Sequence, residues 1–161
     1  MENNSVNFIF NEHFIEHLSE ADGFILLRES YRVLRKNGVL RVCTPSLDKY
    51  VEYFLKETKT DVTSGFRNGT QFLNYAIYGE GWTPGVRVEY LKELSNKKVG
   101  TFLSPGVDHR YIYSLNDIIE KLKFIGFKNI ISVEWGDSKH KDLCNLEHHK
   151  NRMELIIEAT K

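Results

Sequence analysis

The sequence has few cysteines, no excess of either charge and no long apolar run. Two cysteines, Cys43 and Cys144, cannot build a disulfide framework, and neither belongs to a C-x-x-C pair. The 22 basic and 22 acidic side chains cancel, so the charge indicates neither a nucleic-acid nor an anionic-membrane partner. Apolar runs are only a few residues long, so we expect no membrane-spanning helix. We therefore expect a protein of the reducing cytoplasm that binds neither nucleic acid nor membrane.

The elements that are present predict an α/β fold. A length of 161 residues and a hydrophobic fraction of 41 % suit one domain with a modest core. The chain opens in the order strand, helix, strand, helix, which predicts a crossover between two parallel strands. The expected strands cover residues 6–10, 39–44, 127–135 and 153–159, and the expected helices cover 19–37, 46–55 and 115–125.

Two of these helices carry capping signals. Ser19 can cap the first helix, because Asp22 follows at the capping-box spacing. Ser114 and Asp117 repeat this spacing before the last helix. Two glycines suited to the left-handed position are expected to end these helices, Gly38 and Gly126.

The central region, residues 58–108, has weak periodicity and is rich in glycine and aromatic residues. We expect an irregular insert or lid there, with short helices over 70–78 and 88–94, inside a single domain of residues 1–161. A long irregular stretch inside a compact domain is usually functional or mobile. The helix before it is expected to bury one apolar face, made by Leu47, Tyr50, Val51, Phe54 and Leu55.

Three stretches, 6–18, 27–45 and 109–127, share the order and spacing of one known family. They read VNFIFNEHFIEHL, LRESYRVLRKNGVLRVCTP and HRYIYSLNDIIEKLKFIGF. They resemble class I S-adenosylmethionine-dependent methyltransferases. In that family a Glu-His-Leu turn follows a strand, Arg-Val-Leu-Lys-Pro-Gly-Gly ends a helix, Thr-Pro ends the next strand, and a late helix leads into Gly-Phe.

The resemblance implies a Rossmann-like methyltransferase half-domain, a mixed sheet of about four strands with flanking helices. It implies S-adenosylmethionine as cofactor and methyl transfer to an acceptor that the sequence does not name. The family's Gly-rich cofactor loop and ribose-binding carboxylate lie before these stretches, and no G-x-G-x-x-G occurs in the sequence. The alternative is a non-catalytic binding or oligomerisation module derived from the same fold.

Asn11, Glu12 and His13 are the candidate cofactor-binding residues. They follow the first strand, and ligands of open α/β sheets bind beyond the carboxyl ends of parallel strands. The resemblance implies that this loop borders the methionine part of the cofactor. The alternative is that these residues only shape the turn between strand and helix.

His109, Arg110, Tyr111 and Tyr113 are the candidate substrate-binding residues. They precede the last capped helix, where a histidine or tyrosine could orient a proton during methyl transfer. The alternative is an interface between the insert and the core.

The letters His13-Phe-Ile-Glu16-His17 also spell H-x-x-E-H, an inverted zinc-peptidase pattern. Two histidines one helical turn apart could share a zinc ion, with the glutamate as base. Only about one turn of helix fits before Ser19, and the sequence offers no obvious third ligand. We therefore expect no metal site.

The missing family strands would leave residues 6–10 at the edge of the sheet. An apolar edge strand with unpaired backbone groups is a site of association. We therefore expect a homo-oligomer, most simply a symmetric dimer through this strand. A partner chain that supplies the missing half, or a longer protein of which this chain is a fragment, are the alternatives.

Overall fold

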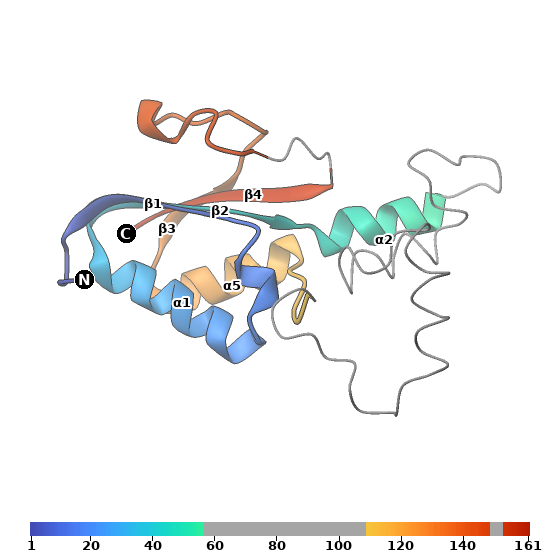
Figure 1. Ribbon diagram of the computed structural model, residues 1–161, viewed down its shortest axis with the longest axis horizontal. Helices are drawn as coiled ribbons and strands as arrows, with labels where there is room; N and C mark the ends of the chain where they lie inside the picture. The colour runs from blue at the N-terminus through green and yellow to red at the C-terminus, as the bar shows by residue number, and fades with distance from the viewer. Residues whose placement is uncertain (57–108, 149–152) are drawn as a thin grey trace, which may run out of the picture.

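The computed structural model describes residues 1–56, 109–148 and 153–161, which form a four-stranded sheet with two helices packed on one face (Figure 1). A loop segment covers part of the opposite face. The strands are β1 (Val6–Glu12), β2 (Leu34–Pro45), β3 (Lys128–Ser132) and β4 (Glu154–Thr160). The helices are α1 (Glu20–Val33), α2 (Leu47–Lys56) and α5 (Leu115–Ile125), with short 3₁₀ turns η1 (Ile15–His17) and η3 (Lys141–Leu143).

The strand order is β1-β2-β4-β3. β1 and β2 are parallel and joined through α1, whereas β4 runs antiparallel to both β2 and β3. This arrangement confirms the predicted mixed sheet of about four strands with flanking helices. It also leaves β1 at one edge of the described sheet, as expected from the sequence.

The core lies between the sheet and the helices α1 and α5. Leu27 of α1 and both Ile118 and Leu122 of α5 are buried against side chains of the central strands. Strand alternation sends Leu155, Ile157 and Ala159 of β4 into this same core. The remaining buried members of the cluster come from β2, from η1 and from the loops: Leu34, Leu40, Val42, Ile15, Tyr113 and Phe127.

The predicted helix caps are confirmed. The Ser19 side chain accepts a hydrogen bond from the Asp22 backbone N–H at 3.2 Å, and Ser114 does the same for Asp117. Gly126 ends α5 with φ 116°, the left-handed conformation that glycine adopts without strain.

The predicted end of the first helix is wrong. α1 stops at Val33 and β2 begins at Leu34, so the chain is already extended before Gly38. Asn37, not Gly38, takes the left-handed conformation, with φ 64°. Pairing with the N-terminal segment explains the difference. The Val33 carbonyl accepts from the Ser5 N–H and Leu34 pairs with Val6 of β1, which draws the chain into the sheet earlier than the helical pattern suggests.

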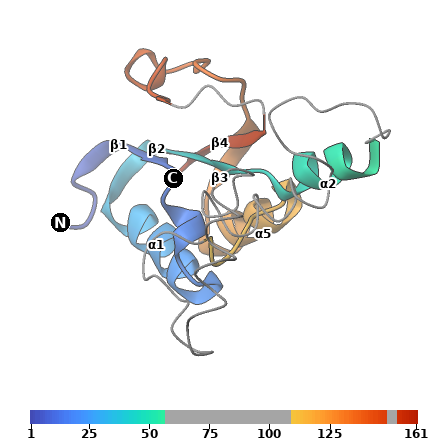
Figure 2. The ribbon, with the colours of Figure 1, turned by 45° about the vertical axis from the view of Figure 1, so that its right-hand side comes forward.

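The apolar face predicted for α2 is largely exposed. Tyr50 is buried, but Val51 and Phe54 are each 39 % exposed and Leu55 is 74 % exposed. α2 begins where β2 ends and extends beyond the sheet, so this face does not meet the core (Figure 2). The insert expected over 58–108, with its two short helices, lies outside the described residues.

Two strand predictions also change. β3 ends at Ser132, earlier than the predicted strand over 127–135. β4 is buried on both faces, because residues 133–148 fold over the face that α1 and α5 leave uncovered (Figures 1 and 2). None of the described helices combines the length and apolarity needed to cross a bilayer.

Candidate functional site

The candidate site lies beyond the carboxyl ends of β1 and β2. His13 leaves β1 in a left-handed conformation, with φ 46°, and its backbone N–H donates to the Cys43 carbonyl at 3.0 Å. Such a conformation is uncommon outside glycine and marks a sharp change of chain direction. The turn aims the His13 side chain back over the strand ends, towards the start of β4.

The His13 imidazole is held between two buried carboxylates. Its Nδ1 lies 3.0 Å from Glu16 Oε1, and its Nε2 lies 2.9 Å from Glu154 Oε1. The hydrogen bond to Glu154 and then that to Glu16 raise the pKa of His13 to about 10, against the opposing effect of burial. His13 is therefore a cation at neutral pH.

Glu16 has no exposed surface and is anchored on both sides. Burial, the largest single effect, opposes its ionisation, but the hydrogen bond and charge of His13, together with bonds from the backbone and the Thr44 hydroxyl, hold its pKa below the usual range. Its second carboxylate oxygen accepts from the Thr44 hydroxyl at 3.0 Å. Its backbone carbonyl accepts from the N–H groups of Arg110 and Tyr111, at 2.7 and 3.2 Å.

These two backbone bonds bring the predicted cofactor and substrate segments together. The rings of His17 and His109 lie 5.1 Å apart, centroid to centroid. Tyr111 packs edge-on against Tyr113, and the Lys121 ammonium lies 5.1 Å from the centre of the Tyr111 ring. The structure thus places the 109–111 segment against the turn that follows residues 11–13, and the roles of both segments in binding stay predictions.

Tyr113 differs from its predicted neighbours. It has no exposed surface and belongs to the core, where its backbone bridges to Ser46 and its carbonyl accepts from the Leu47 N–H. Arg110 is exposed, whereas His109 and Tyr111 are half-buried. Of the four predicted substrate-binding residues, His109, Arg110 and Tyr111 therefore present surface beside the strand ends, and Tyr113 supports them from below.

The three predicted cofactor-binding residues point to different partners. Glu12 accepts from the His148 backbone N–H at 2.8 Å and pairs with its ring at 3.1 Å. His13 bonds to Glu16 and Glu154 as described above. The Asn11 side-chain oxygen is buried and, within the described residues, accepts no hydrogen bond. Asn11 therefore retains an acceptor oxygen for a further donor, while Glu12 and His13 are already engaged with protein groups.

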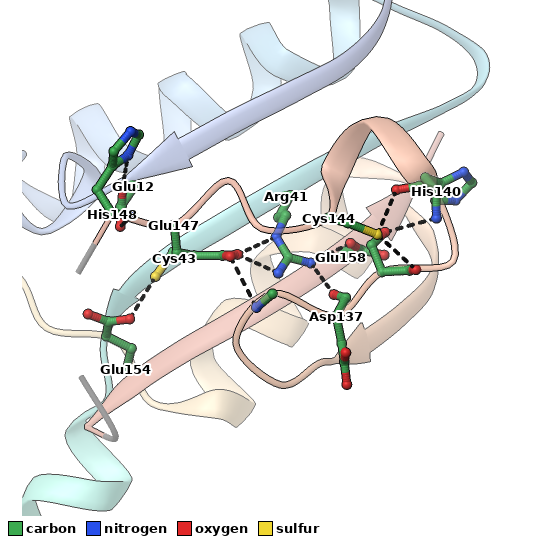
Figure 3. A network of polar contacts seen from close by, with 12 residues as sticks. Glu12, Arg41, Cys43, Asp137, His140, Cys144, Glu147, His148, Glu154 and Glu158 are labelled. Atoms are coloured by element: carbon green, nitrogen blue, oxygen red, sulfur yellow. Dashed lines mark hydrogen bonds and ion pairs between the residues drawn. The ribbon is translucent and has the colours of Figure 1, made fainter. Parts of the chain in front are cut away.

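A second polar network lies under the loop on the other face of the sheet (Figure 3). Arg41, in the middle of β2, has no exposed surface. Its Nε donates to Glu147 at 2.6 Å, and its Nη1 donates to Glu158 at 2.5 Å and to the Asp137 carbonyl at 2.8 Å. The backbone N–H of Gly136 donates to the other oxygen of Glu147. This network ties the 133–148 loop to the sheet.

Sequence reasoning missed Glu154, Thr44 and the partners of Arg41. One signal was present, because Glu154 and Glu158 interrupt an otherwise apolar strand and Arg41 interrupts another. Charged residues in a strand that is buried on both faces need partners of opposite charge. The sequence gives no direct sign of which residue pairs with which.

The H-x-x-E-H interpretation does not fit the backbone. Residues Ile15–His17 form only a 3₁₀ turn, and His13 precedes that turn with a positive φ. His13 and His17 therefore do not share a helix face. Both ring nitrogens of His13 contact carboxylates.

The comparisons with known proteins agree with this fold. No protein-family model and no curated protein sequence matches the chain. Among solved structures, a SAM-dependent methyltransferase from Archaeoglobus fulgidus matches all of this chain and 62 % of its own, at 13 % identity and a TM-score of 0.50. An S-adenosylmethionine-dependent methyltransferase from Mesorhizobium loti matches at 12 % identity over 64 % of its own chain, with a TM-score of 0.48.

The chain thus spans less than two thirds of these two structures. At this identity the likeness shows a fold, and the fold is that of class I methyltransferases. In the described sheet, β1 and β2 are parallel and β4 runs antiparallel to its neighbours β2 and β3.

Proposed function

We propose that this chain supplies the C-terminal part of an S-adenosylmethionine-dependent methyltransferase and takes part in methyl transfer. The observation that carries the proposal is the match of the whole described fold to a methyltransferase of Archaeoglobus fulgidus. Fold alone does not assign an activity, so residues at the strand ends must support it. They do so through Asn11 on one side and the 109–111 segment on the other.

In this proposal S-adenosylmethionine, when bound, supplies a methyl group on a positively charged sulfur. The Asn11 side-chain oxygen accepts a hydrogen bond from the cofactor's ammonium group, because it is buried without a partner in the described chain. His109, Arg110 and Tyr111 border the acceptor. Methyl transfer depends mainly on alignment and on exclusion of water, so these residues position the acceptor without needing a strong acid or base.

Calorimetric titration of the full chain with S-adenosylmethionine and S-adenosylhomocysteine tests the proposal. We expect micromolar binding, weakened at least tenfold by Asn11→Ala, since a buried hydrogen bond to a charged group contributes about 1.5–3 kcal/mol. Asn7→Ala is the matched control, because Asn7 is an exposed asparagine of the same strand. Unchanged binding in Asn11→Ala, or equal loss in both variants, contradicts the role of Asn11, and a parent chain that binds neither compound contradicts cofactor binding by this chain alone.

A non-catalytic module is the second candidate. It is favoured by Glu12 and His13, whose side chains bond to His148, Glu16 and Glu154. In this case no cofactor binds, and the chain acts through its surface. The titration above separates the two candidates.

We also propose that β1 mediates association, either with a second copy of this chain or with a separate partner. Its outer edge lies at the end of the described sheet, and such edges favour strand addition. Light scattering across a concentration series should show a dimer, and a monomer at every concentration contradicts self-association. We place the protein in the cytoplasm, where its two free cysteines would stay reduced.

A further inference from the structure

The side chains of Glu16, His17 and His109 converge beside the ends of β1 and β2. Each offers one ligand atom, and these three atoms lie within 4.8 Å of one another. Glu16 and His17 come from the turn after β1, and His109 comes from a segment far along the chain. The sequence expectation of no metal site rested partly on the lack of a third ligand for the pair His13 and His17, and the fold instead brings His109 to Glu16 and His17.

We propose that Glu16, His17 and His109 form a binding site for a divalent first-row transition-metal ion such as Zn²⁺. A set of two imidazoles and one carboxylate binds such ions in preference to Mg²⁺ or Ca²⁺. This site goes beyond methyl transfer and does not depend on it.

The spacing suits one ion. Metal–ligand bonds to imidazole and carboxylate are about 2.0–2.2 Å long, so two ligand atoms of one tetrahedral ion lie about 3.4–3.6 Å apart. The Nε2 of His17 and the Oε1 of Glu16 are 4.0 Å apart, which is close to this spacing. His17 is 28 % exposed at its side chain and His109 is half-buried, so small rotations of these imidazoles complete the approach.

The surroundings hold the carboxylate ligand in place. The Thr44 hydroxyl and the His13 ring orient the two oxygens of Glu16, as hydrogen-bonding neighbours do in established metal sites. The bonds from Arg110 and Tyr111 to the Glu16 carbonyl fix the 109 segment against this turn.

Three protein ligands leave at least one coordination position for water or another small ligand. The ligand atoms of a second group, Glu12, His13 and Cys43, also lie within 4.8 Å of one another. It is the weaker candidate, because Cys43 is buried and donates its thiol proton to Glu154 at 3.3 Å. A metal thiolate would require that proton to leave.

The test is titration of the chelator-treated full chain with Zn²⁺ by calorimetry. We expect one equivalent to bind, with the affinity falling more than tenfold in His17→Gln and in His109→Gln. His148→Gln is the matched control, because its side chain is 83 % exposed and pairs with Glu12 on another part of the site. Unchanged affinity in both ligand variants, or equal loss in the control, overturns the proposal.

Two further readouts keep the test independent of variant folding. In the unaltered chain, Zn²⁺ should shift the ring nitrogen resonances of His17 and His109 but not those of His140 and His148. The Co²⁺ form should show no sulfur-to-cobalt charge-transfer band. Such a band, abolished by Cys43→Ser, would place the ion on the Cys43 group and overturn this assignment. A chain that binds no Zn²⁺ overturns it as well, whatever its affinity for S-adenosylmethionine.

Discussion

The Nε2 of His13 lies 2.9 Å from a carboxylate oxygen of Glu154, although 141 positions separate the two residues. This contact joins the turn after β1 to the first residue of β4. Because Glu16 binds the opposite ring nitrogen, the imidazole is fixed between two carboxylates that are themselves buried. The relative position of the strand ends therefore depends on a charged His13.

The first prediction concerns pH. The folded-state pKa of His13 is raised to about 10 from an unfolded value near 6.5. The stabilising effect is therefore complete below about pH 6.5 and is lost as the pH rises towards 10. Chemical denaturation between pH 6 and 10, with chelator present, should show a falling free energy of unfolding.

Glu154→Gln should lower the pKa of His13 and weaken the dependence of stability on pH. It should lower the free energy of unfolding by about 3 kcal/mol or less, because His13 is partly exposed. Glu29→Gln is the control, since Glu29 belongs to an exposed ion pair with Arg32. A pH profile that is the same in the parent and in both variants would argue against the role of His13.

The second prediction concerns Arg41. Arg41→Met removes the cation from between Glu147 and Glu158, leaving two buried carboxylates unpaired (Figure 3). Removing one partner of a buried ion pair costs about 3–5 kcal/mol. We expect a loss of this size in the free energy of unfolding.

Arg32→Met is the matched control for Arg41→Met, because the Arg32 side chain is 38 % exposed. This substitution should lower the free energy of unfolding by less than about 1 kcal/mol. If the two substitutions cost the same, the buried network contributes little. Replacing Glu147 and Glu158 by Gln in the Arg41→Met background should recover part of the loss, since no unpaired charge then remains.

The third prediction concerns Gly23, which lies in α1 against the Tyr113 hydroxyl. A Cβ at this position would lie 2.2 Å from that oxygen. Alanine favours a helix over glycine by about 1 kcal/mol, but the clash should make Gly23→Ala destabilising in this chain. Thermal unfolding of the purified variant measures the change.

Removing the Tyr113 hydroxyl should make Gly23→Ala stabilising instead of destabilising. In the described residues the Tyr113 hydroxyl is buried without a hydrogen-bond partner, so Tyr113→Phe should be neutral or stabilising. In the Tyr113→Phe background the nearest ring carbon would lie 3.5 Å from the methyl carbon of an alanine at position 23, an ordinary contact. Gly23→Ala should then stabilise, and a continued loss would show that another contact limits this position.

Local signals in the sequence predicted the local structure well. The caps at Ser19 and Ser114 and the left-handed Gly126 each depend on residues within one helical turn, and all three are confirmed. The end of α1 was mispredicted because it depends on pairing with Ser5 and Val6, which lie on the other side of the whole helix in the sequence. Capping chemistry is local, whereas strand pairing is not.

The site shows the same division. The sequence predicted Asn11 to His13 because they follow a strand, and the candidates of the 109–113 segment because they precede a capped helix, and the binding roles of both sets stay predictions. It carried no indication of Glu154 as the partner of His13, or of Glu147 and Glu158 as the partners of Arg41. These pairs span 106 to 141 positions, and only the strand order brings them together.

The last prediction separates the two cysteines by their reactivity. Burial, and then the carboxylate of Glu154, raises the pKa of the Cys43 thiol, whose hydrogen is donated to that carboxylate at 3.3 Å. The thiolate is the reactive form, so Cys43 should react very slowly with a disulfide reagent at pH 8. Cys144 is partly exposed and should react first, and Cys144→Ser should remove the fast phase.

Glu154→Gln removes the carboxylate charge that disfavours the Cys43 thiolate, so Cys43 should react faster in this variant than in the parent chain. Fast modification of Cys43 in the folded parent chain would contradict the packing of β2 against β4.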